Sequence, residues 1–179
     1  METERLIMRR WQESDHEPFA ALNADPQVME HFVKPLTREE SDQMIDRMEA
    51  AFDRQGYGLW ALEVHETGEF IGFTGLIHHA FLTEVEVGWR LSRASWGHGY
   101  ATEAARAAVA YAFDELELPE LVSMTTVANV RSRAVMERLG MTRNPADDFD
   151  HPNVPEDSPV RRTVLYRLPN PSPAAQKTS

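Results

Sequence analysis

The spacing of hydrophobic residues changes several times along the chain, and each change marks a predicted element of secondary structure. Alternation with a period of two predicts strands, and a period near 3.6 predicts amphipathic helices. Strands are predicted over residues 5–11, 59–64, 70–77, 83–91, 121–127 and 162–168. Helices are predicted from Ser14 through Leu22, in a short stretch starting near Gln27, and over residues 37–52, 101–116 and 129–139.

Capping signals support three of the predicted helix ends. Ser14 and Glu17, and again Thr37 and Glu40, have the spacing of a capping box, in which each residue's side chain accepts a backbone amide of the other. Gly140 follows the last predicted helix, where a glycine commonly ends a helix in the left-handed conformation.

The order of elements is strand, helices, three-strand meander, helix, strand, helix, strand. It predicts a mixed α/β (α+β) fold with a mostly antiparallel sheet of six to seven strands and about four flanking helices. No repeat or linker divides the chain, so we expect one domain over residues 1–168. Residues 169–179 contain three prolines and are predicted to form a disordered tail.

Composition narrows the function classes. The chain has 179 residues, no cysteine and a formal net charge of −11. The lack of cysteine excludes disulfides, thiolate metal sites and an acyl-cysteine intermediate. The negative charge argues against binding to nucleic acid or anionic membranes; it favours cationic substrates such as amines, or simply solubility. No signal peptide or bilayer-spanning run is recognised, so a cytoplasmic protein is expected.

A glycine-containing loop, Trp96-Gly97-His98-Gly99-Tyr100-Ala101, stands between a predicted strand and a predicted helix. The first turn of a helix leaves amide groups unpaired and carries partial positive charge. Glycines let the backbone approach an anion closely, so the loop has the character of a phosphate-binding loop. It contains no Lys or Arg, so backbone groups would do most of the binding. A plain strand-to-helix turn is the other interpretation.

A dinucleotide-binding fold is a sharper alternative, but the sequence argues against it. The G-x-G-x-x-G pattern requires a third glycine, and Thr102 occupies that position. The acidic residue expected at the end of the next strand is also misplaced, because Glu120 precedes the predicted strand instead of following it.

Two segments in this order resemble the GNAT superfamily of N-acetyltransferases: EVGWRLSRASWGHGYATEA and NVRSRAVMERLGM. The resemblance is closest to the branch that includes enzymes acetylating the N-termini of ribosomal proteins. It covers residues 5–168 and is most specific from Glu86 to Met141. The family loop carries Gln or Arg, two residues, Gly, one residue, then Gly or Ala. Gly99 and Ala101 match it, and Trp96 replaces the Gln or Arg, as is usual in this branch.

The resemblance implies a GNAT-like sheet with a splayed cleft for acetyl-CoA as cosubstrate. The strand before the loop would part from its neighbour at a bulge, placed here at Gly88, and pair with the pantetheine arm. One of its amides could polarise the thioester carbonyl. The residues assigned to coenzyme binding are Trp89, Arg90, Leu91, Trp96, Gly97, His98, Gly99, Tyr100, Ala101, Thr102, Asn129 and Ser132.

The candidate general bases are carboxylates and one histidine. Glu84 and Glu86 alternate with valines and so share one face of their strand. An acceptor ammonium must lose a proton before it attacks, and the resemblance favours Glu86 for this role. A solvated strand face is the alternative for both residues. Asp150 and His151 could also border the acceptor pocket, or belong to a charged loop.

Ser132 lies on the apolar stripe of its predicted helix, one turn from the capping residue Asn129. The resemblance places its hydroxyl near the coenzyme sulfur. Many members protonate the leaving thiolate with a tyrosine seven residues after this Asn, but Met136 stands there. Ser132, water or the amine would then supply the proton. Alternatively, the Ser132 hydroxyl bonds the carbonyl four residues earlier.

The sequence therefore predicts transfer of acetyl from acetyl-CoA to a primary amine, by direct attack in a ternary complex. The acceptor could be a small amine or a protein N-terminus, and the protein a monomer or homodimer. No metal is expected, because the adjacent His78 and His79 would point to opposite faces of a strand. A non-catalytic acyl-CoA-binding regulatory or sensor module is the alternative from another class.

Overall fold

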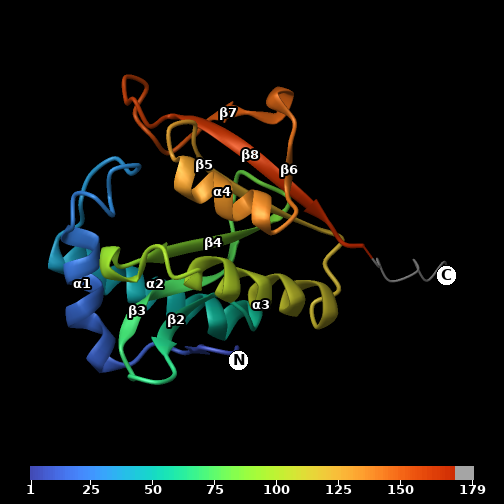
Figure 1. Cartoon of the computed structure of the whole chain (residues 1–179). Helices are drawn as coiled ribbons and strands as arrows, with labels where there is room; N and C mark the ends of the chain where they lie inside the picture. Colours follow the sequence, from blue (N-terminus) through green and yellow to red (C-terminus); the bar gives the residue numbers. More distant parts are fainter. Residues whose placement is uncertain (172–179) are drawn as a thin grey trace.

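A computed structural model describes residues 1–171 and places eight strands in one sheet (Figure 1). The strand order is β1-β2-β3-β4-β5-β8-β6, with β7 also paired to β8. All neighbouring strands are antiparallel except β4 and β5. The strands are β1 Leu6–Arg9, β2 Leu59–Val64, β3 Phe70–His78, β4 Val85–Leu91, β5 Glu120–Thr126, β6 Thr142–Arg143, β7 Phe149–Asp150 and β8 Arg162–Pro169. The predicted mixed fold is confirmed, and two two-residue strands are added to the six predicted.

Four α-helices flank the sheet, again as predicted. They are α1 His16–Ala24, α2 Arg38–Gln55, α3 Tyr100–Asp114 and α4 Val130–Arg138. Three short 3-10 turns occur at Glu13–Asp15, Arg93–Ser95 and Pro145–Asp147. Within residues 1–171, no helix has both the length and the apolar character needed to cross a membrane.

Each face of the sheet carries its own hydrophobic core. One core packs Trp11, Phe19 and Phe73 between α1, α2 and the sheet, with the Trp11 and Phe19 ring centroids 4.8 Å apart. In the other core, α3 lies against the sheet through alanines, which allow the helix a close approach. The fully buried alanines of α3 are Ala104, Ala105, Ala108 and Ala112.

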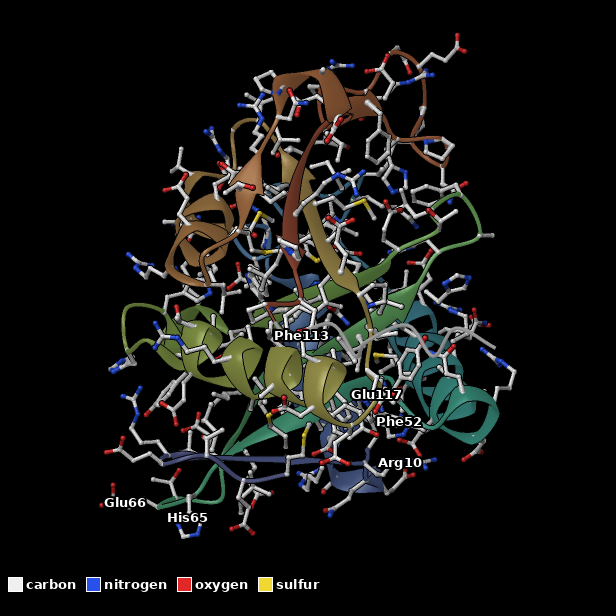
Figure 2. All side chains as sticks on the ribbon, turned by 90° about the vertical axis from the view of Figure 1, so that its right-hand side faces the viewer. Arg10, Phe52, His65, Glu66, Phe113 and Glu117 are labelled. Atoms are coloured by element: carbon white, nitrogen blue, oxygen red, sulfur yellow. The ribbon has the colours of Figure 1, made fainter. Side chains whose placement is uncertain are left out.

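Aromatic rings also join α2 to α3 around the sheet. Phe52 of α2 packs on Trp60 of β2 at 5.4 Å between ring centroids, and Trp60 packs at the same distance on Tyr111 of α3. The Arg10 guanidinium lies 4.8 Å above the Phe52 ring (Figure 2). These ring contacts connect α2 to α3 through Trp60 of β2.

The capping box at Thr37 is confirmed, whereas the one expected at Ser14 is wrong. Thr37 Oγ1 accepts the Glu40 amide at 3.2 Å, and a Glu40 carboxylate oxygen accepts the Thr37 amide at 2.8 Å. The first turn begins at Gln12 instead, whose amide donates to Asp15 Oδ2 at 2.9 Å. Asp15 is held there by an ion pair with Arg9 at 2.7 Å, so a 3-10 turn capped at Gln12 precedes α1, whose own N-cap is Asp15.

The short helix expected near Gln27 is also wrong. Residues 25–36 form turns without a helix. The Asp25 side chain accepts the Gln27 amide at 2.8 Å and closes a single turn. The chain then returns to α1, where the Leu36 amide donates to Asn23 O at 3.0 Å. We call residues 25–36 the α1–α2 segment.

The predicted tail begins too early. Pro169 belongs to β8, and Asn170 is buried. Asn170 donates from its amide to Pro119 O at 2.8 Å and from Nδ2 to Leu118 O at 3.0 Å. These bonds fasten the end of β8 to the segment before β5. The rest of the predicted tail, residues 172–179, lies outside the described residues.

Candidate active site

β4 and β5 form a fork in the middle of the sheet. They pair only at Val85 with Leu121 and at Glu86 with Val122. Beyond Glu86 the two strands separate, although β4 stays paired with β3 as far as Leu91. The bulge expected at Gly88 is therefore wrong, because the β3–β4 register runs through Gly88 without a shift. β4 and β5 separate because the pairing between them ends after Glu86 and Val122.

The glycine loop sits at the N-terminus of α3. Gly97 and Gly99 have φ angles of 81° and 83°, which side-chain-bearing residues rarely adopt, and Gly99 is the N-cap. A Cβ on Gly97 would meet no atom within 4 Å, so the backbone is open to an incoming group. The Glu103 amide bonds back to Gly99 O at 3.0 Å. The preceding amides are those that a helix start leaves unpaired.

Arg5 adds a cation to this loop, which the sequence interpretation missed. Its Nη1 donates to His98 O at 2.9 Å, and its guanidinium forms an ion pair with Glu103 at 2.6 Å. It also lies 4.8 Å above the Tyr100 ring. Arg5 precedes the first strand, so only the folded arrangement of β1 beside α3 brings it here; no local motif could have indicated it.

A cleft of about 1470 Å³ runs along the fork. One end is lined by Arg5 and the glycine loop, and the other end by His79, Glu86 and His151. Every residue predicted to bind coenzyme lines it except His98. The His98 ring stacks on Tyr100 with the centroids 5.5 Å apart, while its carbonyl accepts from Arg5. The fold thus brings residues from distant segments to one continuous surface.

Glu86 lies at the point where the fork opens. It is 6% exposed, and its Oε1 accepts the Met124 amide of β5 at 3.3 Å. Its Oε2 lies 2.5 Å from His79 Nε2. The carboxylate therefore has both a backbone donor and a histidine partner inside the cleft, an arrangement that can accept a proton and pass it on.

His79 was considered in the sequence only as a metal ligand, and its pairing with Glu86 was missed. Ile77 pairs with Glu86 across the hairpin, so His79 is a diagonal neighbour of Glu86. The pairing register of this hairpin is the feature that could have indicated the contact between His79 and Glu86. Phe81 links His79 to His151, with ring centroids at 5.0 Å and 4.9 Å. Burial, followed by the nearby charge of His79, lowers the pKa of His151.

The other acidic candidates do not line the cleft. Glu84 forms an ion pair with Arg167 of β8 at 2.6 Å, and this contact lowers the pKa of Glu84 to about 2. Asp150 is paired with Arg162 at 3.3 Å, with both side chains more than half exposed. Neither carboxylate is therefore placed to receive a proton from an acceptor in the cleft.

The start of α4 forms another wall of the cleft. Asn129 Oδ1 accepts the Ser132 amide at 3.1 Å, as its predicted capping role requires, and Asn129 Nδ2 donates to Thr125 Oγ1 at 2.9 Å. Among residues 1–171, Ser132 Oγ has no hydrogen-bond partner, so the expected alternative bond to the carbonyl four residues earlier is not formed. Met136 is fully buried in the core and does not line the cleft.

Arg90 projects from the same strand as Glu86. Its Nη1 donates to Asn23 Oδ1 at 2.6 Å, and its guanidinium lies 4.2 Å above the Phe32 ring. Phe32 belongs to the α1–α2 segment. Sequence reasoning assigned only the backbone of Arg90 a role; the structure adds a side chain that borders the cleft.

Comparisons with known proteins agree with this geometry. A model of the acetyltransferase (GNAT) domain matches residues 5–142. YkkB from Bacillus subtilis (strain 168) is 30% identical over 142 residues, covering 78% of this chain and 83% of that protein. The FsC-acetyl coenzyme A-N(2)-transacetylase of Aspergillus fumigatus is 38% identical over 140 residues, covering 72% of this chain and 59% of that protein.

Solved structures share the fold. An acetyltransferase from Agrobacterium tumefaciens str. C58 superposes with a TM-score of 0.78 at 32% identity, covering 94% of this chain and 92% of that one. The ribosomal-protein-S5-alanine acetyltransferase of Vibrio fischeri superposes with a TM-score of 0.71 at 16% identity, covering 98% of each chain. The second likeness concerns the fold alone.

Proposed function

The chain belongs to the GNAT family of acetyl-CoA-dependent N-acetyltransferases, and on that premise we propose that it acetylates a primary amine by direct attack in a ternary complex. The observation that carries the proposal is Glu86, a buried carboxylate held at the opening of the fork by Met124 and His79. Membership of an enzyme family sets aside the alternative of a non-catalytic binding module. A cytoplasmic location and the absence of a metal requirement are part of the proposal.

The residues of the cleft fit the coenzyme. The open, positive-φ glycines and unpaired amides at the start of α3 suit a pyrophosphate, with Arg5 adding positive charge. The edge of β4 beyond Glu86 has lost its β5 partner and suits an amide-bearing arm, with Asn129 on the facing wall. When bound, acetyl-CoA supplies an activated acetyl thioester.

Glu86 acts as the general base in this proposal. Its Oε2 takes the proton that the acceptor ammonium must lose, directly or through water, and His79 Nε2 shares that proton at 2.5 Å. A β4 amide polarises the thioester carbonyl. Ser132 Oγ lines the cleft, has no hydrogen-bond partner among residues 1–171, and donates a hydrogen bond to the departing sulfur. The thiolate takes up the second proton that the amine nitrogen loses as the amide forms, directly or through water.

The acceptor is a small amine or a protein N-terminus. An FsC-acetyl coenzyme A-N(2)-transacetylase of Aspergillus fumigatus is among the relatives, and a ribosomal-protein-S5-alanine acetyltransferase of Vibrio fischeri shares the fold. The cleft continues past Glu86 to His151 and the α1–α2 segment, so it offers an acceptor surface beyond the residues proposed to bind the coenzyme.

Glu86→Gln tests the proposed base. We expect turnover with a responsive amine from a panel to fall by about a hundredfold to ten-thousandfold, with affinity for CoA little changed. Thiol release measures the rate, and calorimetry measures CoA binding. Glu84→Gln is the matched control, because it removes the same charge from a residue outside the cleft. Full activity of Glu86→Gln across roughly pH 6 to 9, where amines and histidines titrate, would exclude Glu86 as the base.

A further inference from the structure

Glu86 and Arg90 lie on one face of β4 with only Gly88 between them. Alternate residues of a strand share a face, so these three positions form one row along the cleft. Gly88 has no side chain to separate the two charged groups. Four residues of strand place their Cα atoms about 13 Å apart. The acceptor side of the cleft therefore carries a carboxylate at one end and a guanidinium at the other.

The Arg90 guanidinium has no carboxylate partner among residues 1–171. It is held by Asn23 at 2.6 Å and by the faces of Phe32 and Phe73, at 4.2 and 5.4 Å. Its Nε is shielded from solvent and has no hydrogen-bond partner in the described part of the chain. Burial lowers the pKa of Arg90 to about 10, which leaves the group charged at neutral pH.

A shielded cation without a counter-ion is unfavourable unless something else compensates it. The aromatic faces and one neutral amide compensate it only partly. The chain has a formal net charge of −11, so carboxylates are plentiful, yet none lies within ion-pair distance of this guanidinium among the described residues. A bound anion would complete the set of partners.

We propose that the acceptor is an amine that also carries a carboxylate, which binds Arg90 while the ammonium group lies at Glu86. The inference rests on the proposed function, because it identifies the acceptor class for the same site. The separation of the two groups along β4 requires several bonds between amine and carboxylate. It therefore favours ω-amino carboxylates over free α-amino acids.

Matched acceptor pairs test the proposal. β-Alanine, γ-aminobutyrate and ε-aminocaproate are compared with their uncharged carboxamides in a thiol-release assay with acetyl-CoA. Loss of a hydrogen bond to a charged group corresponds to about 10-fold to 100-fold. We expect at least one carboxylate to exceed its carboxamide in kcat/KM by that factor, mainly through a lower KM. Equal or better use of every carboxamide overturns the proposal and leaves the proposed function intact.

Variants then show whether Arg90 causes the preference. In Arg90→Gln the ratio of carboxylate to carboxamide kcat/KM should fall close to one, and in Arg90→Glu it should fall below one. Arg47→Gln is the matched control, since Arg47 is exposed on α2 outside the cleft and its loss changes net charge equally. It should keep the wild-type ratio. If the ratio of carboxylate to carboxamide kcat/KM is unchanged in Arg90→Gln, Arg90 does not bind the acceptor carboxylate and has only a structural role beside Phe32.

Equilibrium binding separates this inference from the proposed function. Calorimetry with CoA present measures binding of the N-acetylated carboxylates and their carboxamides, and it needs no turnover. Tighter binding of the carboxylates that disappears in Arg90→Gln supports the anion subsite even if no acceptor is acetylated. Equal binding of both compounds overturns it, whatever the rate assay shows.

Discussion

Glu86 of β4 and Glu84, which immediately precedes that strand, have very different surroundings. Glu84 is paired with Arg167 of β8, which also contacts Glu120 and Asp147, so its charge joins the residue before β4 to β5, to β8 and to the 3-10 turn at Asp147. Glu86 is paired with His79 inside the cleft. The alternation with valine predicted a shared strand face, but the strand begins after Glu84. That Glu84 has a structural role and Glu86 a chemical one could not be predicted, because the difference depends on the partners that other parts of the fold bring to each carboxylate.

The Glu84 network predicts a pH-dependent stability. The pKa of Glu84 is lowered to about 2, so its contribution is complete above the ordinary carboxyl pKa and is lost as the pH falls through the folded value. Glu84→Gln should lower the free energy of unfolding by about 1–2 kcal/mol at neutral pH, discounted for partial exposure. Urea unfolding should show this deficit narrowing from about pH 5 toward pH 2. A deficit that is constant with pH contradicts the ion-pair origin, and Glu66→Gln in an exposed turn is the control.

The hydroxyl of Ser132, which is unpartnered among residues 1–171, predicts that the substitution Ser132→Ala slows turnover without lowering the stability of the fold. Its hydroxyl has no partner among the described residues, so Ser132→Ala removes no protein hydrogen bond and should leave the unfolding midpoint unchanged. If the hydroxyl bonds the leaving sulfur, turnover should fall by up to about tenfold. Wild-type turnover would show that the Ser132 hydroxyl does not assist departure of the sulfur. Met136→Tyr is not expected to restore the rate, because Met136 is fully buried and a larger ring would overpack the core.

At the scale of elements, the period of hydrophobic residues correctly predicted every main strand and helix. The errors arose where a side-chain hydrogen bond or ion pair formed in place of the predicted cap or helix. Asp15 is used by Arg9 and Gln12, which moves the first cap away from Ser14. Asp25 closes a turn at Gln27 where a helix was expected. Both errors concern short polar segments, where a single side-chain bond outweighs periodicity. The start of α3 was predicted well because its glycines and helix pattern are local.

The glycine loop gives a prediction for the start of α3. Gly99→Asp places a carboxylate beside the expected pyrophosphate, and its Cβ would lie 3.5 Å from Arg5 Nη2, which it would partly neutralise. We expect CoA affinity to fall by at least about tenfold, measured by calorimetry. Gly68→Asp is the matched control, because Gly68 has a φ of 70°, open surroundings and no part in the cleft. If both variants bind CoA as the wild type does, the loop does not hold the phosphates.

At the scale of the molecule, the sheet consists of two antiparallel parts joined by the short parallel contact between β4 and β5. The first part contains β1 to β4 and the second contains β5, β8, β6 and β7. The six longer strands could be predicted from the sequence, whereas the two-residue strands β6 and β7 could not. The place where the parts separate could not, because Gly88 suggested a bulge whereas the ladder simply ends after Glu86. The extent of strand pairing is set by the packing of whole layers, not by one residue.

This division predicts where coenzyme binding should slow hydrogen exchange. A ligand lying in the fork gives new partners to amides on both walls, so residues 87–91 of β4 and 123–126 of β5 should gain protection together with the loop 97–102. With CoA at about a hundredfold over its Kd, opening that requires release of the ligand should become about a hundredfold rarer. The turn at Glu66, in Figure 2 at the end of the molecule opposite β7 and β8, should keep its exchange rate. Protection confined to the loop would place the coenzyme outside the fork and would remove the reason for locating the base at Glu86.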